Sequence, residues 1–130
     1  GVATSGPRAN ARFLLRELGL DRLFHAVVWG DASIRSKPHP DSFLRAAARM
    51  GVPPVQCLGF EDSPHGCWAV RRAGMRLMAV AERPDDRIAN AKWTPWVMDD
   101  FRPALRRLEA MWRSSSPSLC NGRSSRRKVW

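Results

Sequence analysis

Short apolar runs alternate with amphipathic stretches along most of this 130-residue chain, and this alternation limits the possible folds more than any other feature. The apolar runs predict strands at GVAT, HAVVWG, VQCLGF and RLMAVA, and a weak fifth strand at WVM. Apolar side chains at helical spacing predict helices over residues 7–18, 40–50, 64–73 and 101–112. Because strands that alternate with helices form parallel sheets covered on both faces, we predict a Rossmann-like three-layer α/β/α fold.

Length and composition narrow the class of protein. A chain of 130 residues, 44% of them hydrophobic, can bury one core but is too short for two ordinary domains. No apolar run approaches the roughly 18 residues of a membrane span, and the N-terminus lacks the pattern of a secretory signal. We therefore expect a cytoplasmic protein with no membrane partner, while an organelle address upstream of Gly1 stays open. The cysteines show no CxxC spacing, so we expect them to be reduced.

The formal net charge of +10 is concentrated toward the C-terminus. No acid follows Glu109, whereas five basic residues do: Arg113, Arg123, Arg126, Arg127 and Lys128. This segment is rich in Ser and Arg and has no apolar periodicity, which is typical of a disordered extension. We predict a core domain over residues 1–112 and a basic tail over 113–130, and we consider nucleic-acid binding through this tail the least favoured function.

The third apolar run is followed by two adjacent acids, Glu61 and Asp62. Two neighbouring carboxylates repel each other and are costly to bury unless a cation relieves them. If that repulsion is only partly relieved, replacing both acids by amides should leave the isolated chain equally stable or slightly more stable. Alone, such a pair is also compatible with a solvated turn.

Other polar residues are expected at the same end of the sheet. Thr4 and Ser5 follow the first strand, and Lys37 lies in the loop after the second. In parallel sheets, ligands bind beyond the carboxyl ends of the strands. Paired carboxylates suit Mg²⁺, and a lysine with hydroxyls suits a phosphate, so their joint placement indicates phosphoryl transfer.

Three segments resemble a known family: VATSG, SKPHPDSF and GFEDSPHGCWAVRRAGM. They are similar to the second, third and fourth motifs of the haloacid dehalogenase-like hydrolases, in the subgroup of sugar-phosphate phosphatases and beta-phosphoglucomutases. Within this subgroup the chain most resembles the fructose-1-phosphate phosphatase-like members. The resemblance covers residues 1 to about 112.

The resemblance implies a role for each candidate residue. Thr4 would bind the transferring phosphoryl oxygen through its hydroxyl, with Ser5 adding a neighbouring N–H and hydroxyl. Lys37 would hold the phosphate against the nucleophile. Glu61 and Asp62 would help to bind Mg²⁺, Asp62 directly and Glu61 directly or through water. The substrate would be a small phosphorylated metabolite, a sugar phosphate.

Residues around these candidates have supporting roles. Ser63 is placed to cap the next helix, and Gly66 would let that helix approach the site closely. Asp41 would fix the Lys37 loop by bonding backbone amides at the start of a helix. His39 and His65 lie in the two site loops, but the family does not need a histidine there.

The family's nucleophile has no counterpart in this sequence. It is an aspartate after the first strand, followed two residues later by a second aspartate that acts as general acid and base, and no two aspartates have this spacing here. The resemblance therefore implies a fragment without the first, central strand and the cap domain, marginally stable and inactive alone. A catalytically inactive module that keeps phosphate and cation contacts is the alternative. The incomplete sheet also offers edges for self-association.

Overall fold

A computed structural model describes residues 1–115 of the chain. It divides into two units, Gly1–Asp100 and Phe101–Trp130. The second unit contains helix α5, Arg102–Ser115, so the first residues of the expected basic tail are helical. The rest of that tail lies outside the described residues. In residues 1–115 no helix is long and apolar enough to cross a membrane.

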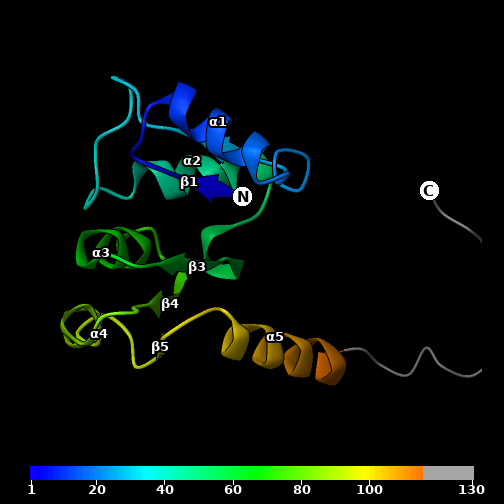
Figure 1. Ribbon diagram of the computed structural model, residues 1–130, viewed down its shortest axis with the longest axis vertical. Coiled ribbons are helices and arrows are strands. Elements are labelled where there is room, and N and C mark those ends of the chain that lie inside the picture. The colour runs from blue at the N-terminus through cyan, green and yellow to red at the C-terminus, as the bar shows by residue number, and fades with distance from the viewer. Residues whose placement is uncertain (116–130) are drawn as a thin grey trace, which may run out of the picture. The chain divides into compact units, whose positions relative to one another are not determined.

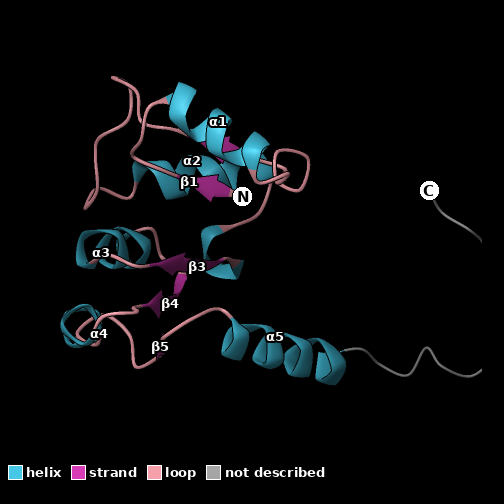
Figure 2. Cartoon of the chain, viewed as in Figure 1, coloured by secondary structure: helices cyan, strands magenta, loops and turns pink. Residues whose placement is uncertain are grey.

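The first unit follows the predicted order of strands and helices (Figures 1 and 2). Its elements are β1 (Val2–Ala3), α1 (Arg8–Glu17), β2 (Val27–Val28), α2 (Asp41–Met50), a short 3₁₀ helix (Pro54–Gln56), β3 (Leu58–Glu61), α3 (Pro64–Arg72), β4 (Arg76–Val80), α4 (Pro84–Asn90) and β5 (Val97–Met98).

Two local predictions need correction. Glu61 is the last residue of β3 and does not follow the strand. The stretch after β4, where we predicted no helix, forms helix α4. Pro84 at its first position, with Asp85 and Asp86 in the first turn, suits a helix N-terminus, because proline needs no hydrogen-bonded N–H there and acids favour that end of the helix dipole.

The strands form two parallel sheets, which confirms the predicted α/β class. One sheet has the order β1-β2 and the other β3-β4-β5. Val2 lies opposite Val27 in the first sheet, while Leu58 lies opposite Arg76 in the second. Within the described part of the chain β1 does not pair with β3, so the sheet is interrupted between them. The resemblance places the absent central strand at this position, and the chain is a partial domain.

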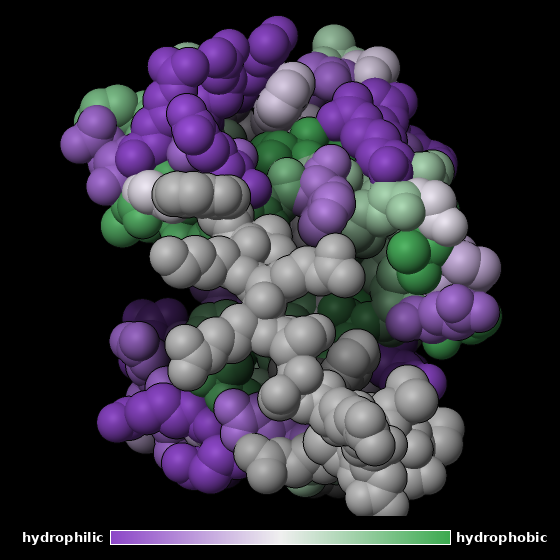
Figure 3. Space-filling model, turned by 90° about the vertical axis from the view of Figure 1, so that its right-hand side faces the viewer, coloured by the Kyte–Doolittle hydropathy of each residue, from purple (hydrophilic) through white to green (hydrophobic). Residues whose placement is uncertain are grey.

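Helices α2 and α3 supply most of the core. Their buried side chains join those of β4 in one cluster of Phe43, Ala47, Cys67, Ala69, Val70, Ala73, Met75, Leu77 and Ala79. Helix α2 ends at Gly51, whose φ of 67° is a left-handed conformation that glycine adopts at little cost. By contrast, no residue of α1 is buried. Figure 3 shows mainly hydrophilic residues over the part of the surface where α1 and α2 lie in Figure 1.

A cavity of about 290 Å³ lies between β1 and β3. It is lined by apolar residues of both strands and of α2, among them Ala3, Leu58 and Ala47. The N–H groups of Val2 and Thr4 donate to carbonyls next to and within β2, at 2.8 and 2.9 Å, so the intervening Ala3 N–H points away from β2. We call this cavity the slot between β1 and β3. Its apolar lining and the outward-facing N–H of Ala3 are what one more strand would need in order to pair with β1.

Candidate phosphate and metal site

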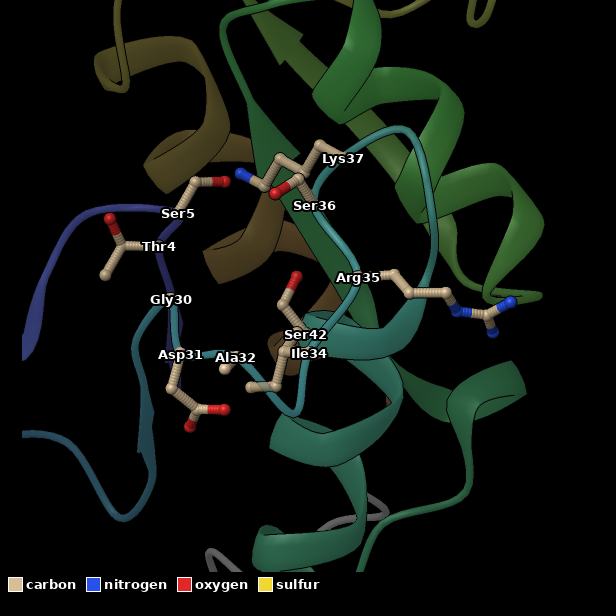
Figure 4. Close-up of a pocket in the computed structure, with 10 residues that line it drawn as sticks. All are labelled: Thr4, Ser5, Gly30, Asp31, Ala32, Ile34, Arg35, Ser36, Lys37 and Ser42. Carbon is tan, nitrogen blue, oxygen red and sulfur yellow. The ribbon is translucent and has the colours of Figure 1, made fainter.

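The structure brings the predicted phosphate-binding residues to one cavity at the carboxyl ends of the strands. This cavity has a volume of about 420 Å³, and Thr4, Ser5 and Lys37 are among the residues that line it (Figure 4). The Ser5 and Lys37 side chains point toward each other, whereas Thr4 is turned away. The Thr4 Oγ1 accepts a hydrogen bond from the Gly6 N–H at 3.0 Å. Here Thr4 shapes the turn that leads into α1, and its role as a phosphate ligand stays a prediction.

Lys37 connects this cavity to the acid pair. Its Nζ forms an ion pair with Glu61 Oε1, and the two side chains are only 16% and 6% exposed. The second carboxylate oxygen of Glu61 is 3.2 Å from the Asp62 N–H and 3.3 Å from the Ser63 hydroxyl, both of which donate to it. The cation that relieves Glu61 in this chain is therefore the ammonium of Lys37.

This ion pair changes one prediction from the sequence. We expected replacement of both acids to leave stability unchanged or slightly improved, because their repulsion would be only partly relieved. Since Lys37 is largely buried against Glu61, replacing Glu61 leaves an ammonium without its counter-ion. Loss of one partner of a buried pair is strongly destabilising, so we now expect the substitution to be harmful.

The start of α3 lies directly against the Glu61 carboxylate. A Cβ atom on Gly66 would lie 2.0 Å from Glu61 Oε2 and 2.1 Å from its Cδ, so the helix approaches the site closely, as predicted, and a larger residue here would have to displace the Glu61 carboxylate. The Ser63 hydroxyl accepts from the Gly66 N–H at 3.1 Å, so the predicted N-cap is present. The positive end of the α3 dipole thus faces a carboxylate, which is the favourable arrangement.

Asp62 differs from Glu61 in its surroundings. Its side chain is exposed, and its backbone carbonyl accepts a 2.7 Å hydrogen bond from Asn90 Nδ2. Asn90 is fully buried and lies on α4, the helix that the sequence did not predict. Asn90 therefore positions the acid pair. The one signal for this role is that Asn90 is a polar side chain at a buried position, where it needs a hydrogen-bond partner.

A second ion pair fixes the loop that carries Lys37. Asp41 accepts from Arg35 Nε at 2.9 Å and from its NH2 at 3.0 Å, and also from the Arg35 backbone N–H at 3.3 Å. The hydrogen bond from Arg35 lowers the pKa of Asp41. Asp41 thus holds the loop as predicted, but through the backbone amide and guanidinium of Arg35 in the loop itself, and not through amides at the start of a helix.

The protein donors for a metal ion are few. Within residues 1–115 no three His, Cys, Asp or Glu side chains gather closely enough to hold one. Glu61 and Asp62 are adjacent, and one Glu61 oxygen already bonds to Lys37. Magnesium is usually held by one or two carboxylates, with phosphate and water as further ligands, so this pair fits as part of a magnesium site.

Comparison with known proteins identifies the family. The family model for haloacid dehalogenase-like hydrolases matches residues 1–74. The chain belongs to this family of hydrolases.

Similar proteins include phosphatases and mutases. The fructose-1-phosphate phosphatase YqaB of Escherichia coli is 50% identical over 79 residues, which make up 61% of this chain and 42% of the relative. Beta-phosphoglucomutase of Bacillus subtilis is 39% identical over 82 residues, or 63% of this chain and 35% of the relative. The crystal structure of beta-phosphoglucomutase from Clostridium difficile has a TM-score of 0.67 at 26% identity, covering 81% of this chain and 45% of that one. The chain thus spans less than half the length of these relatives.

Proposed function

We propose that the chain carries half of the active site of a magnesium-dependent sugar-phosphate phosphatase, and that a strand in the slot between β1 and β3 completes it. The observation that carries this proposal is the convergence of Ser5, Lys37 and Glu61 at the carboxyl ends of strands from both half-sheets. The similarity to fructose-1-phosphate phosphatase YqaB and to beta-phosphoglucomutase supports a phosphorylated sugar as substrate.

The residues of this chain would position the phosphoryl group and neutralise its charge. The Lys37 ammonium, held in place by Glu61, attracts phosphoryl oxygens, while the Ser5 hydroxyl donates a hydrogen bond to them. The Thr4 hydroxyl would donate another once its side chain turns toward the cavity. Asp62 would hold Mg²⁺ directly and Glu61 directly or through water. When bound, the ion would supply further charge neutralisation at the transferring group.

The acceptor of the phosphoryl group would come from the completing strand. No described aspartate at the cavity is followed two residues later by a second acid. We therefore expect the chain alone not to form an aspartyl-phosphate. A phosphate-binding module without catalysis is the second candidate, and the absence of the aspartate pair from the sequence favours it. Self-association through the open edges of β1 and β3, and the cytoplasm as compartment, remain predictions.

The test is to replace the matched region of E. coli YqaB by this chain and to measure phosphate release from fructose 1-phosphate with Mg²⁺. We expect turnover by the chimera and none by the chain alone. Lys37→Ala and Asp62→Asn should abolish it, whereas Lys92→Ala and Asp85→Asn, at exposed positions, should not. A chimera that folds but hydrolyses nothing, or a purified chain that turns over substrate through Asp62, would contradict the proposal.

A further inference from the structure

The cavity that holds Ser5 and Lys37 also contains a buried hydroxyl with no assigned role. Ser42 is 5% exposed and lines this cavity from the first turn of α2. Among the described residues its Oγ has no hydrogen-bond partner. A buried hydroxyl without a partner costs free energy, and a ligand in this cavity would supply that partner once the Ser42 side chain turns further toward it.

The groups that face this cavity suit an oxyanion. Figure 4 shows the hydroxyls of Ser5, Ser36 and Ser42 and the ammonium of Lys37 directed toward the same space. The carboxylate of Asp31, which also lines the cavity, points away from them and accepts from the Ser33 N–H at 2.8 Å. Hydroxyl donors around the Lys37 ammonium, which pairs with one oxygen of Glu61 and has further N–H groups to donate, favour phosphate over a cation or an apolar group.

The position of Ser42 on α2 adds to this preference. Helix α2 has ten residues, Asp41–Met50, and its N-cap is Pro40, which supplies no side-chain hydrogen bond. The unpaired N–H groups of a first turn, together with the helix dipole, favour negative charge close to where Ser42 projects. The guanidinium of Arg35 is not available to a phosphate in the cavity, because it is paired with Asp41 and points away from the hydroxyls.

We propose that Ser42 donates a hydrogen bond to an oxygen of the bound phosphate group, with Ser36 as a second hydroxyl donor from the Lys37 loop. The inference rests on the proposed function, because it assumes that this cavity receives the phosphorylated substrate. Phosphate recognition would then involve Ser36 and Ser42 in addition to Thr4, Ser5 and Lys37. The volume of about 420 Å³ leaves room beside the phosphate for part of the sugar.

The test uses the 130-residue chain itself, with inorganic phosphate as the probe in calorimetric titration at constant ionic strength. Ser42→Ala should weaken phosphate binding by about tenfold, the effect of losing one hydrogen bond to a charged group. Without phosphate, the variant should melt at the same temperature or slightly higher, because it loses a hydroxyl that has no partner. Ser42→Thr, which keeps the hydroxyl, should retain most of the affinity.

Ser33→Ala is the matched control, since Ser33 lies in the same loop but does not line the cavity, and it should leave phosphate affinity unchanged. A purely structural Ser42 would instead lower the melting temperature when replaced and leave affinity intact, which would overturn the inference. Absence of phosphate binding by the wild-type chain would also overturn it. Serine-dependent binding together with an inactive YqaB chimera would contradict the proposed catalysis and leave this inference standing.

Discussion

Breaking the ion pair between Lys37 and Glu61 should destabilise the chain far more than removing both charges together. The two side chains are 16% and 6% exposed, so either charge left alone would remain largely out of water. Glu61→Gln and Lys37→Met each remove one charge at similar volume. The double variant removes both and leaves neither an ammonium nor a carboxylate without its partner.

The expected magnitudes follow from the burial of the pair. Removing one partner of a buried pair costs about 3–5 kcal/mol, whereas replacing both by neutral groups is often close to neutral. Since a natural domain has about 5–15 kcal/mol of stability in total, each single variant should lose a large fraction of it. The double variant should cost little, so the coupling free energy, which is the sum of the two single costs minus the cost of the double variant, should be about 6–10 kcal/mol.

Urea unfolding followed by tryptophan fluorescence measures these free energies from the midpoint and the slope. If a single variant is unfolded in buffer, sucrose restores a measurable transition, because excluded osmolytes favour the compact state. The exposed pair of Arg83 and Asp86, at 81% and 30% side-chain exposure, is the matched control and should contribute little to stability. Single variants that each cost less than this control, or costs that simply add in the double variant, would refute the reasoning.

Three further predictions concern the same region. Gly66→Ala should displace the Glu61 carboxylate, which its Cβ would approach to 2.0 Å, and should lower the urea midpoint; an unchanged midpoint would show that Glu61 moves without cost. Ser63→Ala should lower the free energy of unfolding by about 1 kcal/mol through loss of the α3 cap, and a value near zero in the same assay would mean that the cap is redundant. Burial, with Glu61 and Asp62 nearby, raises the pKa of Cys67 from 9.0 to about 11, so iodoacetamide at pH 8 should modify Cys57 before Cys67 in the native chain. Peptide mapping that finds equal modification rates for the two cysteines would contradict this. Because the thiol loses its proton at lower pH in the unfolded chain, the contribution of Cys67 to stability should fall as pH rises from 9.0 to about 11.

The sequence predicts the regular elements well where periodicity and capping agree. Helix α3 is an example, because Ser63 and Pro64 mark its start and an apolar stripe marks its buried face. Helix α4 was missed because its seven residues carry little apolar periodicity, and its proline and paired acids are also typical of a loop.

Site residues were predicted from strand ends and from the family resemblance, but their partners were not. Lys37 and Glu61 are 24 positions apart in the chain, and only the fold brings their charges together. The same holds for Asn90, which reaches the Asp62 carbonyl from α4, 28 positions further along the chain. Periodicity reports on which side of an element a residue lies, whereas such long-range pairs depend on how the elements pack.

Amide hydrogen exchange at Ala3 tests most directly whether the site residues stand on two half-sheets with an open strand position between them. In the chain alone, the Ala3 N–H should exchange much faster than the neighbouring Thr4 N–H, which donates to Val28 at 2.9 Å. In the YqaB chimera, where a strand can fill the slot between β1 and β3, the Ala3 N–H should become as protected as that of Thr4. An Ala3 amide that is already as protected as Thr4 in the chain alone would contradict the open position, and with it the proposal that a further strand completes the site.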